Sequence, residues 1–106
     1  MGGRNYRKGR AFEYRVKHYL EKHGSFVVRS ASSHGPADLV AMKGGKVLLV
    51  QCKMRGNLSK VEKDELINAA NLAGANCCLA YPNPYDSKDI ILWNLNLDPQ
   101  TSREIP

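Results

Sequence analysis

Four consecutive apolar residues after a pair of glycines constrain the fold of this chain more than any other feature. Residues 47–50 are apolar at every position, as expected of a central strand that is covered on both faces. The Gly44-Gly45 pair before them is a hairpin signal, and residues 38–42 are predicted as the preceding strand. We therefore expect an antiparallel hairpin inside a sheet that has packed layers on both sides.

Two amphipathic segments predict helices on either side of this hairpin in the chain. In the first, about residues 7–23, one apolar stripe at helical spacing consists of Phe12, Val16, Tyr19 and Leu20. The second begins with the capping-box pattern Ser59-Lys60-Val61-Glu62 and ends before Gly74. Its apolar face consists of Leu66, Ala69, Ala70 and Ala73. Three alanines on one face predict close packing against the sheet.

Three further strands complete the predicted pattern. They are residues 25–30, 76–81 and 89–95, and residues 82–85 are predicted as a loop. The order α-β-β-β-α-β-β predicts an α/β fold with a mixed five-stranded sheet flanked by helices. The 106 residues are expected to form one domain, 1–106, with residues 1–5 and 97–106 as flexible ends.

The charge of the chain is divided unequally along its length. Residues 1–60 carry 13 Lys and Arg against 3 Asp and Glu, a balance of +10, and residues 61–106 carry 3 against 7, a balance of −4. This asymmetry predicts a one-sided positive field, which nucleic acid would feel. A solvated basic helix without a partner explains the same charge, so charge alone leaves both interpretations open.

The three cysteines indicate a reducing compartment. Cys52, Cys77 and Cys78 have no metal-binding spacing, and the two neighbours are poorly placed to bridge each other. Buried thiols in a cytoplasmic protein are expected. No apolar segment follows the N-terminal charges, and none is long enough to span a bilayer. We therefore expect no signal peptide, no membrane partner and a soluble protein.

An acidic residue and a Gln-x-Lys triplet mark the ends of the two hairpin strands. Asp38 follows Gly35-Pro36-Ala37, and Gln51-Cys52-Lys53 ends the second strand. Because side chains alternate along a strand, Gln51 and Lys53 share a face, and the hairpin would bring Asp38 close to both. Oxygen ligands beside an ammonium suit metal-assisted cleavage of a phosphodiester. The alternatives are a turn-capping Asp38 and a Lys53 whose ammonium reaches water.

Two further groups complete the candidate site. Glu13 lies on the shoulder of the first helix's apolar stripe and is placed to face the same end of the sheet. The alternative for it is an ordinary solvated glutamate paired with Arg10 or Lys17. The backbone carbonyl of Cys52 offers another oxygen to a hard cation such as Mg²⁺. Gln51 stands where a second carboxylate is expected.

Basic and hydroxyl side chains flank these residues in the sequence. Arginine binds phosphate bidentately, lysine acts as a point charge, and serine hydroxyls donate to phosphate oxygens. The candidates for contacts with nucleic acid are Arg4, Arg7, Lys8, Arg10, Arg29, Lys43, Lys46 and Arg55, together with Ser30, Ser32 and Ser33. The serines are equally consistent with ordinary loop residues.

Three segments of the chain resemble the archaeal-type Holliday junction resolvases, which also occur in some viruses. The segments are Tyr6-Arg7-Lys8-Gly9-Arg10-Ala11-Phe12-Glu13, Val27-Val28-Arg29-Ser30-Ala31-Ser32-Ser33 and Asp38-Leu39-Val40-Ala41. The similarity covers about the first 55 residues well. It implies the restriction-endonuclease-like core of the PD-(D/E)xK nuclease superfamily. It also implies a homodimer that introduces paired nicks into four-way DNA junctions using Mg²⁺, with Mn²⁺ able to substitute.

The resemblance also implies residue roles. Glu13, Asp38 and Lys53 match the family's catalytic residues, and Gln51 occupies the place of a glutamate. The implied metal ligands are Asp38, Gln51, the Cys52 carbonyl and Glu13. The segments expected to approach the DNA backbone contain Arg7, Arg10, Arg29 and residues 30–33. Loss of one negative charge at Gln51 should weaken Mg²⁺ binding, although related branches of the superfamily use Gln-x-Lys natively.

Three functions therefore remain open from the sequence. The first is a junction-resolving endonuclease, and the second is a repair or restriction-like nuclease that acts on flaps or ordinary duplex. The third is a junction-binding protein whose metal site is impaired by Gln51. For the homodimer, the expected contact surface is the later, less basic half of the chain, where Leu92, Trp93 and Leu95 offer apolar area.

Overall fold

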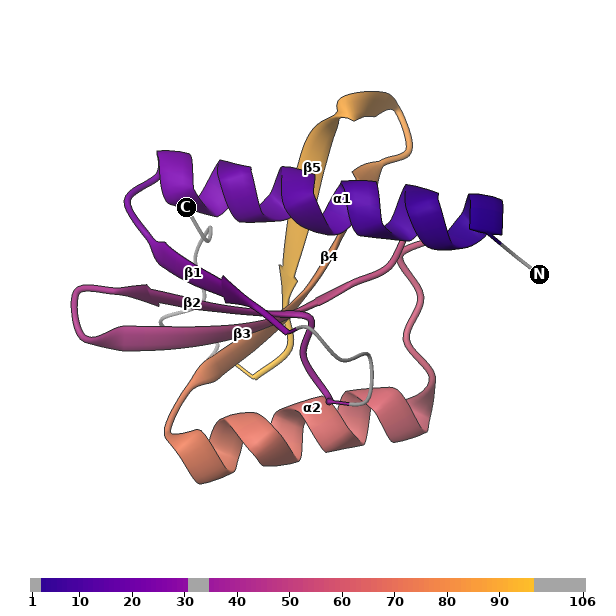
Figure 1. The fold of residues 1–106 in the computed structure, drawn as a ribbon. Coiled ribbons are helices and arrows are strands. Elements are labelled where there is room, and N and C mark those ends of the chain that lie inside the picture. Colours follow the sequence, from indigo (N-terminus) through magenta and orange to yellow (C-terminus); the bar gives the residue numbers. More distant parts are fainter. Residues whose placement is uncertain (1–2, 31–34, 97–106) are drawn as a thin grey trace.

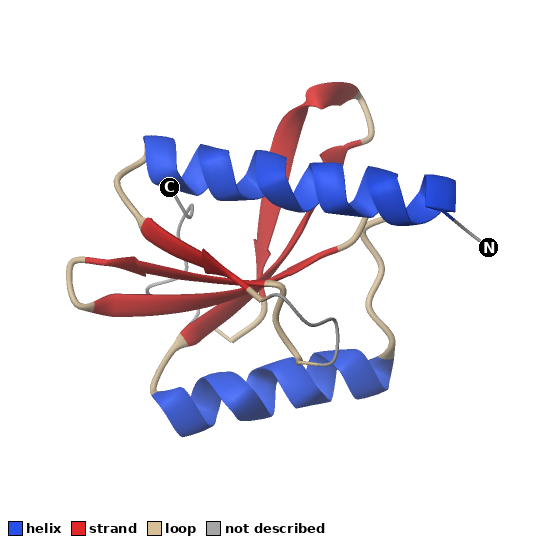
Figure 2. Ribbon diagram, in the orientation of Figure 1, coloured by secondary structure: helices blue, strands red, loops and turns tan. Residues whose placement is uncertain are grey.

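A mixed five-stranded sheet forms the middle layer of the protein, and one helix covers each of its faces (Figures 1 and 2). The computed structural model describes residues 3–30 and 35–96, and the side chains of residues 8–30 and 35–96. The elements are α1 (Gly3–Lys22), β1 (Phe26–Arg29), β2 (Leu39–Lys43), β3 (Lys46–Cys52), α2 (Lys60–Ala73), β4 (Asn76–Asn83) and β5 (Asp86–Asn94). The predicted order of elements and the predicted mixed sheet are both confirmed.

The spatial order of the strands follows their order in the chain. Among the described strands, β3 and β4 are the parallel pair, and the other neighbours pair antiparallel. A parallel pair needs a crossover connection, which α2 supplies. The predicted hairpin joins β2 to β3: Lys43 pairs with Lys46, and Gly44 and Gly45 have φ angles of 57° and 79°. Glycine adopts these two positive angles without strain, and the tight turn matches the twist of the strands.

Helix α1 begins earlier than the sequence predicted. It starts at Gly3 rather than Arg7, so residues 3–5 of the predicted flexible N-terminus are helical. The predicted stripe begins at Phe12, so it marked the helix but not its first turns. The predicted flexible segment 97–106 lies outside the described residues. Neither of the described helices is both long and apolar enough to cross a membrane.

The last two strands are longer than predicted, and the loop between them is shorter. The predicted loop at residues 82–85 is wrong, because β4 and β5 are joined by a turn at residues 84–85 alone. Pro82 pairs with Ile90 inside the ladder, and the register shifts just after it, between Pro82 and Asn83. Proline lacks an N–H for the ladder, and a strand tolerates it at such an irregularity.

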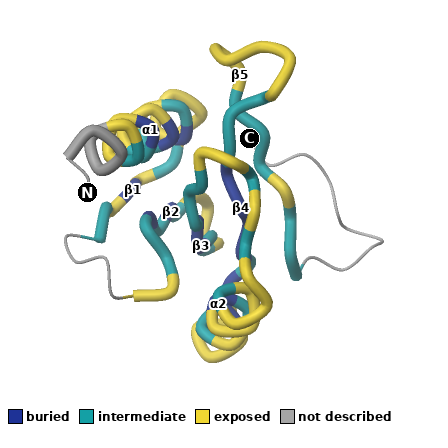
Figure 3. Tube along the Cα trace, turned by 90° about the vertical axis from the view of Figure 1, so that its right-hand side faces the viewer, coloured by how far each residue is buried: buried dark blue, intermediate teal, exposed yellow. Residues whose placement is uncertain are grey.

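The chain buries two apolar cores, one on each face of the sheet (Figure 3). The core under α1 consists of Phe12, Val16, Leu20, Val27, Leu39, Ala41, Val50, Cys78 and Ala80. The core under α2 consists of Leu49, Leu66, Ala70, Ala75 and Cys77. Leu49 and Val50 are consecutive in β3 yet belong to different cores, because side chains alternate along a strand. Strand β3 is therefore covered on both faces, as its apolar run predicted.

The small-residue face of α2 packs on the sheet over most of its length. Leu66 and Ala70 are completely buried, and Ala69 packs against the same core. Ala73, which was predicted to share this contact, is exposed. It is the last residue of α2, and the chain leaves the helix at once through Gly74 in the left-handed conformation (φ 64°).

The cysteines are buried or half-buried free thiols. Cys77 and Cys78 are adjacent in β4, so they point into different cores. Burial raises the pKa of the Cys77 thiol to about 11 and also raises the pKa of Cys78. Burial and the charge of Asp38 raise the pKa of Cys52. These thiols stay protonated, as expected of cysteines that pack in an apolar core.

The turn that follows β3 depends on a glycine at position 56. The Gly56 N–H donates to the Lys53 carbonyl (3.2 Å), and its φ is +68°. A Cβ atom at this position would lie 2.8 Å from Cδ2 of Tyr81, because the backbone packs directly on the aromatic ring. Both the backbone conformation and the contact therefore exclude a side chain, and the turn fixes where the chain goes after Lys53.

We expect Gly56→Ala to destabilise the protein more than Gly74→Ala does. Gly74 has a similar φ (+64°), but a Cβ there meets nothing within 4 Å. Gly74→Ala should therefore lower the free energy of unfolding only by the cost of the left-handed backbone, about 1–2 kcal/mol. Gly56→Ala adds the contact with the Tyr81 ring, about 1–3 kcal/mol more. Urea unfolding of both variants measures the difference, and equal losses would show that the ring moves aside freely.

Candidate active site

The β2–β3 hairpin brings Asp38 against the end of β3. The Asp38 N–H donates to the Val50 carbonyl at 2.8 Å, and Leu39 pairs with Val50 in the ladder. The Cys52 N–H in turn donates to Oδ2 of Asp38 at 2.9 Å, so the backbone of β3 holds the carboxylate. Asp38 therefore lies at the end of the hairpin away from its Gly-Gly turn, held by the backbone on either side of Gln51. A contact of the Gln51 side chain with Asp38 stays a prediction.

Lys53 continues from β3 and turns toward α2. Its N–H donates to the Ala80 carbonyl at 2.9 Å, which extends the parallel pairing of β3 and β4. Its ammonium Nζ lies 2.7 Å from Oε2 of Glu62 in the first turn of α2. The sequence indicated that Lys53 needs an anionic partner or water, and the structure assigns that partner as Glu62.

Glu62 is the residue that the sequence analysis missed at this site. It was identified only as a member of the capping box, and that box is present: Oγ of Ser59 accepts from the Glu62 N–H, and Oε1 of Glu62 accepts from the Ser59 N–H. The signal was available in the order of elements. A helix that crosses between parallel strands starts near the end of the strand before it, so the first turn of α2 lies beside Lys53.

Glu13 reaches the site through an ion pair with Arg29. Its Oε1 accepts from Nε of Arg29 at 3.0 Å, and both side chains are about four-fifths buried, with exposed fractions of 21% and 19%. The Arg29 guanidinium also lies 5.0 Å from the centre of the Tyr14 ring. Of the alternative partners Arg10 and Lys17, Lys17 instead bonds to Glu21 at 2.7 Å, whereas the charge of Arg10 does act on Glu13. Arg29 ties α1 to the end of β1, next to the start of β2.

Asp38 and Glu13 are harder to ionise than ordinary carboxyl groups, whereas the hydrogen bond from Lys53 lowers the pKa of Glu62. Burial raises the pKa of Asp38, and the charge of Glu62 raises it further. The Cys52 N–H, Lys53 and Arg29 oppose this rise without cancelling it. Burial and the charge of Asp38 likewise raise the pKa of Glu13. Uncompensated negative charge of this kind is relieved by a bound cation.

The oxygen atoms available at this site suit a hard divalent cation. Among the described residues, no three side chains of His, Cys, Asp or Glu converge closely enough to hold a metal ion. A cation bound at Asp38 would therefore draw on neutral oxygens as well. The amide of Gln51 and the backbone carbonyl of Cys52 are of the kind that Mg²⁺ accepts beside one or two carboxylates. The donor set fits a metal, with one carboxylate fewer than a Glu at position 51 would give.

The structure separates the flanking basic residues into two groups. Arg10 is exposed on α1 and lowers the pKa of Glu13 by its charge, and Arg55 is exposed in the turn after Lys53. Both lie at the Asp38 end of the sheet. Lys43 and Lys46 instead flank the turn at the opposite end of the hairpin, where Nζ of Lys43 donates to the His23 carbonyl at 2.7 Å. Nearness in sequence to Asp38 was misleading for these two lysines.

For the remaining candidate DNA contacts, the structure describes the side chains of some residues but not of others. Lys8 is exposed on α1, and the Ser30 N–H donates to the Asp38 carbonyl at 2.8 Å. Arg4 and Arg7 belong to α1, but their side chains lie outside the described residues. Ser32 and Ser33 lie outside them entirely.

The sequence and the fold are similar to those of known nucleases. The family model described as archaeal Holliday junction resolvase (Hjc) matches residues 4–97. The crossover junction endodeoxyribonuclease Hjc of Methanocaldococcus jannaschii is 39% identical over 79 residues, which cover 71% of this chain and 59% of the relative. The chain therefore spans less than two-thirds of that relative's length. The structure of Archaeoglobus fulgidus Hjc, a Holliday junction resolvase, matches with a TM-score of 0.71 at 28% identity, covering 83% of this chain and 73% of the other.

We expect Asp38→Asn to stabilise the protein at neutral pH when no divalent metal is present. The pKa of Asp38 is raised in the folded protein, so its ionisation costs stability, and the cost appears as the pH rises through that raised pKa. Asparagine removes the charge and keeps an oxygen that accepts from the Cys52 N–H. Thermal unfolding in a chelator between about pH 4 and pH 8 tests this, since the two proteins should converge toward the ordinary pKa of aspartate.

The matched control for this prediction is Glu65→Gln, which removes an exposed carboxylate from α2. It should leave the midpoint of unfolding nearly unchanged over the same pH range. If Asp38→Asn is less stable than the wild type at neutral pH, the carboxylate is favourably paired in the folded state and the site is not short of positive charge.

Proposed function

Because the chain belongs to the archaeal Holliday junction resolvase family, we propose that it is a metal-dependent endodeoxyribonuclease that cleaves four-way DNA junctions. The observation that carries this proposal is the cluster at the end of the hairpin. Asp38 is fixed by the Cys52 N–H, and the Lys53 ammonium, which is bonded to Glu62 in the first turn of α2, lies within electrostatic reach of it. Oxygen ligands next to an ammonium are what hydrolysis of a phosphodiester requires.

In this function the chain's own oxygens hold the metal, and Mg²⁺ is the proposed ion, with Mn²⁺ as a substitute. The proposed ligands are the Asp38 carboxylate, the Gln51 amide oxygen and the Cys52 carbonyl, with Glu13 holding the ion or its hydration shell. When bound, a divalent ion stabilises charge on the scissile phosphate and lowers the pKa of a water. The raised pKa values of Asp38 and Glu13 support this assignment, since both carboxylates gain from a cation.

Lys53 carries the positive charge that the reaction needs beside the metal ligands. Its ammonium donates hydrogen bonds, so it would orient the attacking water and stabilise the negative charge that develops on the phosphate. Its charge lowers the pKa of Asp38, which places it within electrostatic reach of that carboxylate. Its side chain remains 32% exposed, so a substrate can approach it from solvent.

The proposed DNA contacts lie around this end of the sheet. Lys8, Arg10 and Arg55 are exposed and basic, and Arg7 and residues 30–33 are proposed to join them. Contacts of this kind go to phosphates, so the protein would recognise the shape of a junction rather than its sequence, with an affinity that falls with salt. Arg29 is committed to Glu13 and Tyr14, and we assign it to orienting Glu13 in preference to gripping DNA.

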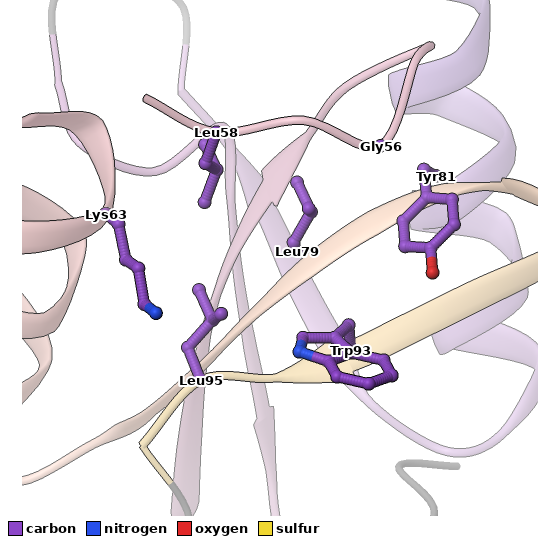
Figure 4. Close-up of a pocket in the computed structure, with 7 residues that line it drawn as sticks. All are labelled: Gly56, Leu58, Lys63, Leu79, Tyr81, Trp93 and Leu95. Carbon is purple, nitrogen blue, oxygen red and sulfur yellow. The ribbon is translucent and has the colours of Figure 1, made fainter. Parts of the chain in front are cut away.

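A homodimer is the proposed active form, because two identical sites related by a two-fold axis can nick symmetric strands of one junction. Leu92, Trp93 and Leu95, the predicted apolar contact residues of the dimer, do not all lie on the same face of the sheet. Leu92 packs toward the core under α1, whereas Trp93, 60% exposed, and Leu95 line a shallow hollow of about 240 Å³ on the α2 side (Figure 4). The proposed contact surface therefore reduces to the hollow around Trp93 and Tyr81.

The test of the proposed function is cleavage of a labelled four-way junction in the presence of Mg²⁺. The wild type should nick opposing strands symmetrically, and Asp38→Asn should lose at least about 100-fold in rate while still binding the junction. Linear duplex of the same length serves as the competitor. Equal cleavage by the two proteins would reject the assigned site, and preference for the duplex would favour the repair or restriction-like nuclease.

Gln51 supports one other candidate function, a junction-binding protein with little catalysis. A neutral amide at this position binds Mg²⁺ more weakly than a carboxylate. We expect Gln51→Glu to lower the Mg²⁺ concentration needed for cleavage and to raise the rate by about tenfold. Cleavage rates across a Mg²⁺ titration measure both effects.

The control for the added charge is Asn68→Asp, on the exposed surface of α2. It adds the same negative charge away from the site and should not change the Mg²⁺ dependence. If the wild type binds junctions tightly without cutting them and Gln51→Glu restores cutting, the binding function is the natural one. If neither property changes, position 51 does not contact the metal.

A further inference from the structure

Glu62 uses both of its carboxylate oxygens in different interactions. Oε1 accepts from the backbone N–H of Ser59 at 3.0 Å, which closes the cap of α2. Oε2 lies 2.7 Å from Nζ of Lys53. The first interaction is local to the helix, and the second reaches nine residues back to the end of β3. The cap therefore fixes the orientation of the carboxylate that the ammonium meets.

Two carboxylates, those of Glu62 and Asp38, lie near enough to attract the Lys53 ammonium. Glu62 holds it by a hydrogen bond, and Asp38 is within electrostatic reach of both groups, since Lys53 lowers its pKa and Glu62 raises it. The neighbour on the same strand face, Gln51, offers no charge. Without Glu62, Asp38 is the described carboxylate whose pKa Lys53 already lowers, since Glu13 at the same end is paired with Arg29. An ammonium seated on Asp38 would compete with a metal for the carboxylate.

We propose that Glu62 is a positioning residue for the reaction: it holds the Lys53 ammonium beside Asp38 but off it, which leaves the Asp38 carboxylate for the metal. This inference rests on the proposed function of the site. Glu62 acts through Lys53 and need not touch DNA or metal. The backbone N–H of residue 59 orients the Glu62 carboxylate, whereas the Ser59 hydroxyl bonds only to the Glu62 N–H and takes no part in this role.

The capping box allows the two roles of Glu62 to be separated by mutation. Glutamine at this helix position still accepts from the Ser59 N–H, so Glu62→Gln keeps the cap and removes the charge. Ser59→Ala is the matched control, because it removes the cap's hydroxyl and leaves the Glu62–Lys53 ion pair. If Glu62 positions Lys53, the first variant should affect cleavage and the second should affect mainly stability.

The experiment measures junction binding, single-turnover cleavage and thermal unfolding for the wild type and both variants. Glu62→Gln should lower the cleavage rate by about 10- to 100-fold, as the loss of a group that orients an active-site residue does. Its junction affinity and unfolding midpoint should stay near those of the wild type. Ser59→Ala should lower the unfolding midpoint and keep the cleavage rate within about twofold.

A second readout does not depend on cleavage. An ammonium held by a carboxylate reacts slowly with an acylating reagent, and Asp38→Asn removes the carboxylate to which the ammonium could move. Acetic anhydride followed by mass spectrometry should therefore modify Lys53 faster in Asp38→Asn/Glu62→Gln than in Asp38→Asn. Lys63, exposed on the same helix, serves as the internal reference. Ser59→Ala should leave Lys53 protected.

The outcomes separate this inference from the proposed function. Normal cleavage by Glu62→Gln, with cleavage abolished in Asp38→Asn, would overturn the positioning role and leave the nuclease intact. Equal loss of cleavage in Glu62→Gln and Ser59→Ala would also overturn it, since the cap alone would then explain the effect. A wild type that cuts no junction would sink the proposed function, and the labelling of Lys53 would still decide whether Glu62 holds the ammonium.

Discussion

The antiparallel register between β2 and β3 is the constraint on which the candidate site depends. It places the Asp38 carboxylate against the Cys52 N–H. Because the side chains of a strand alternate between faces, a slip of one residue would turn Gln51 and Lys53 toward α1. The register is held by the two cores, since Leu39 and Val50 must face α1 while Leu49 must face α2. The geometry of the site is thus a consequence of core packing by the neighbouring residues of the same hairpin.

Glu13 and Glu62 each have a cationic partner, whereas Asp38 does not form such an ion pair among the described residues, and this difference favours metal binding at Asp38. Arg29 pairs with Glu13 and Lys53 pairs with Glu62, so these two cations are bonded to carboxylates other than Asp38. Asp38 itself is held by a backbone N–H and has a raised pKa. A divalent cation is the natural complement of such a carboxylate. The neutral Gln51 reduces the negative charge available to that cation, which makes the arrangement of the remaining carboxylates more important.

Local patterns in the sequence were sufficient for most of the architecture. The apolar run in β3, the Gly44-Gly45 turn and the capping box at Ser59 each depend on a few neighbouring residues, and each was found where predicted. The ends of elements, which have weaker local signals, were predicted less accurately. The start of α1 lies before its apolar stripe, and Pro82 sits inside β4 because a shift in register accommodates it.

The sequence by itself determined that Asp38 lies beside the end of β3, because a two-residue turn fixes how the two strands of the hairpin pair. It did not determine the partners of Glu13 and Lys53, nor that Lys43 and Lys46 lie far from the site. Those pairings join segments that are distant in the chain, α1 with β1 and β3 with α2. Only the packing of both helices on the sheet decides them, since an ion pair between separate elements depends on where each element comes to rest.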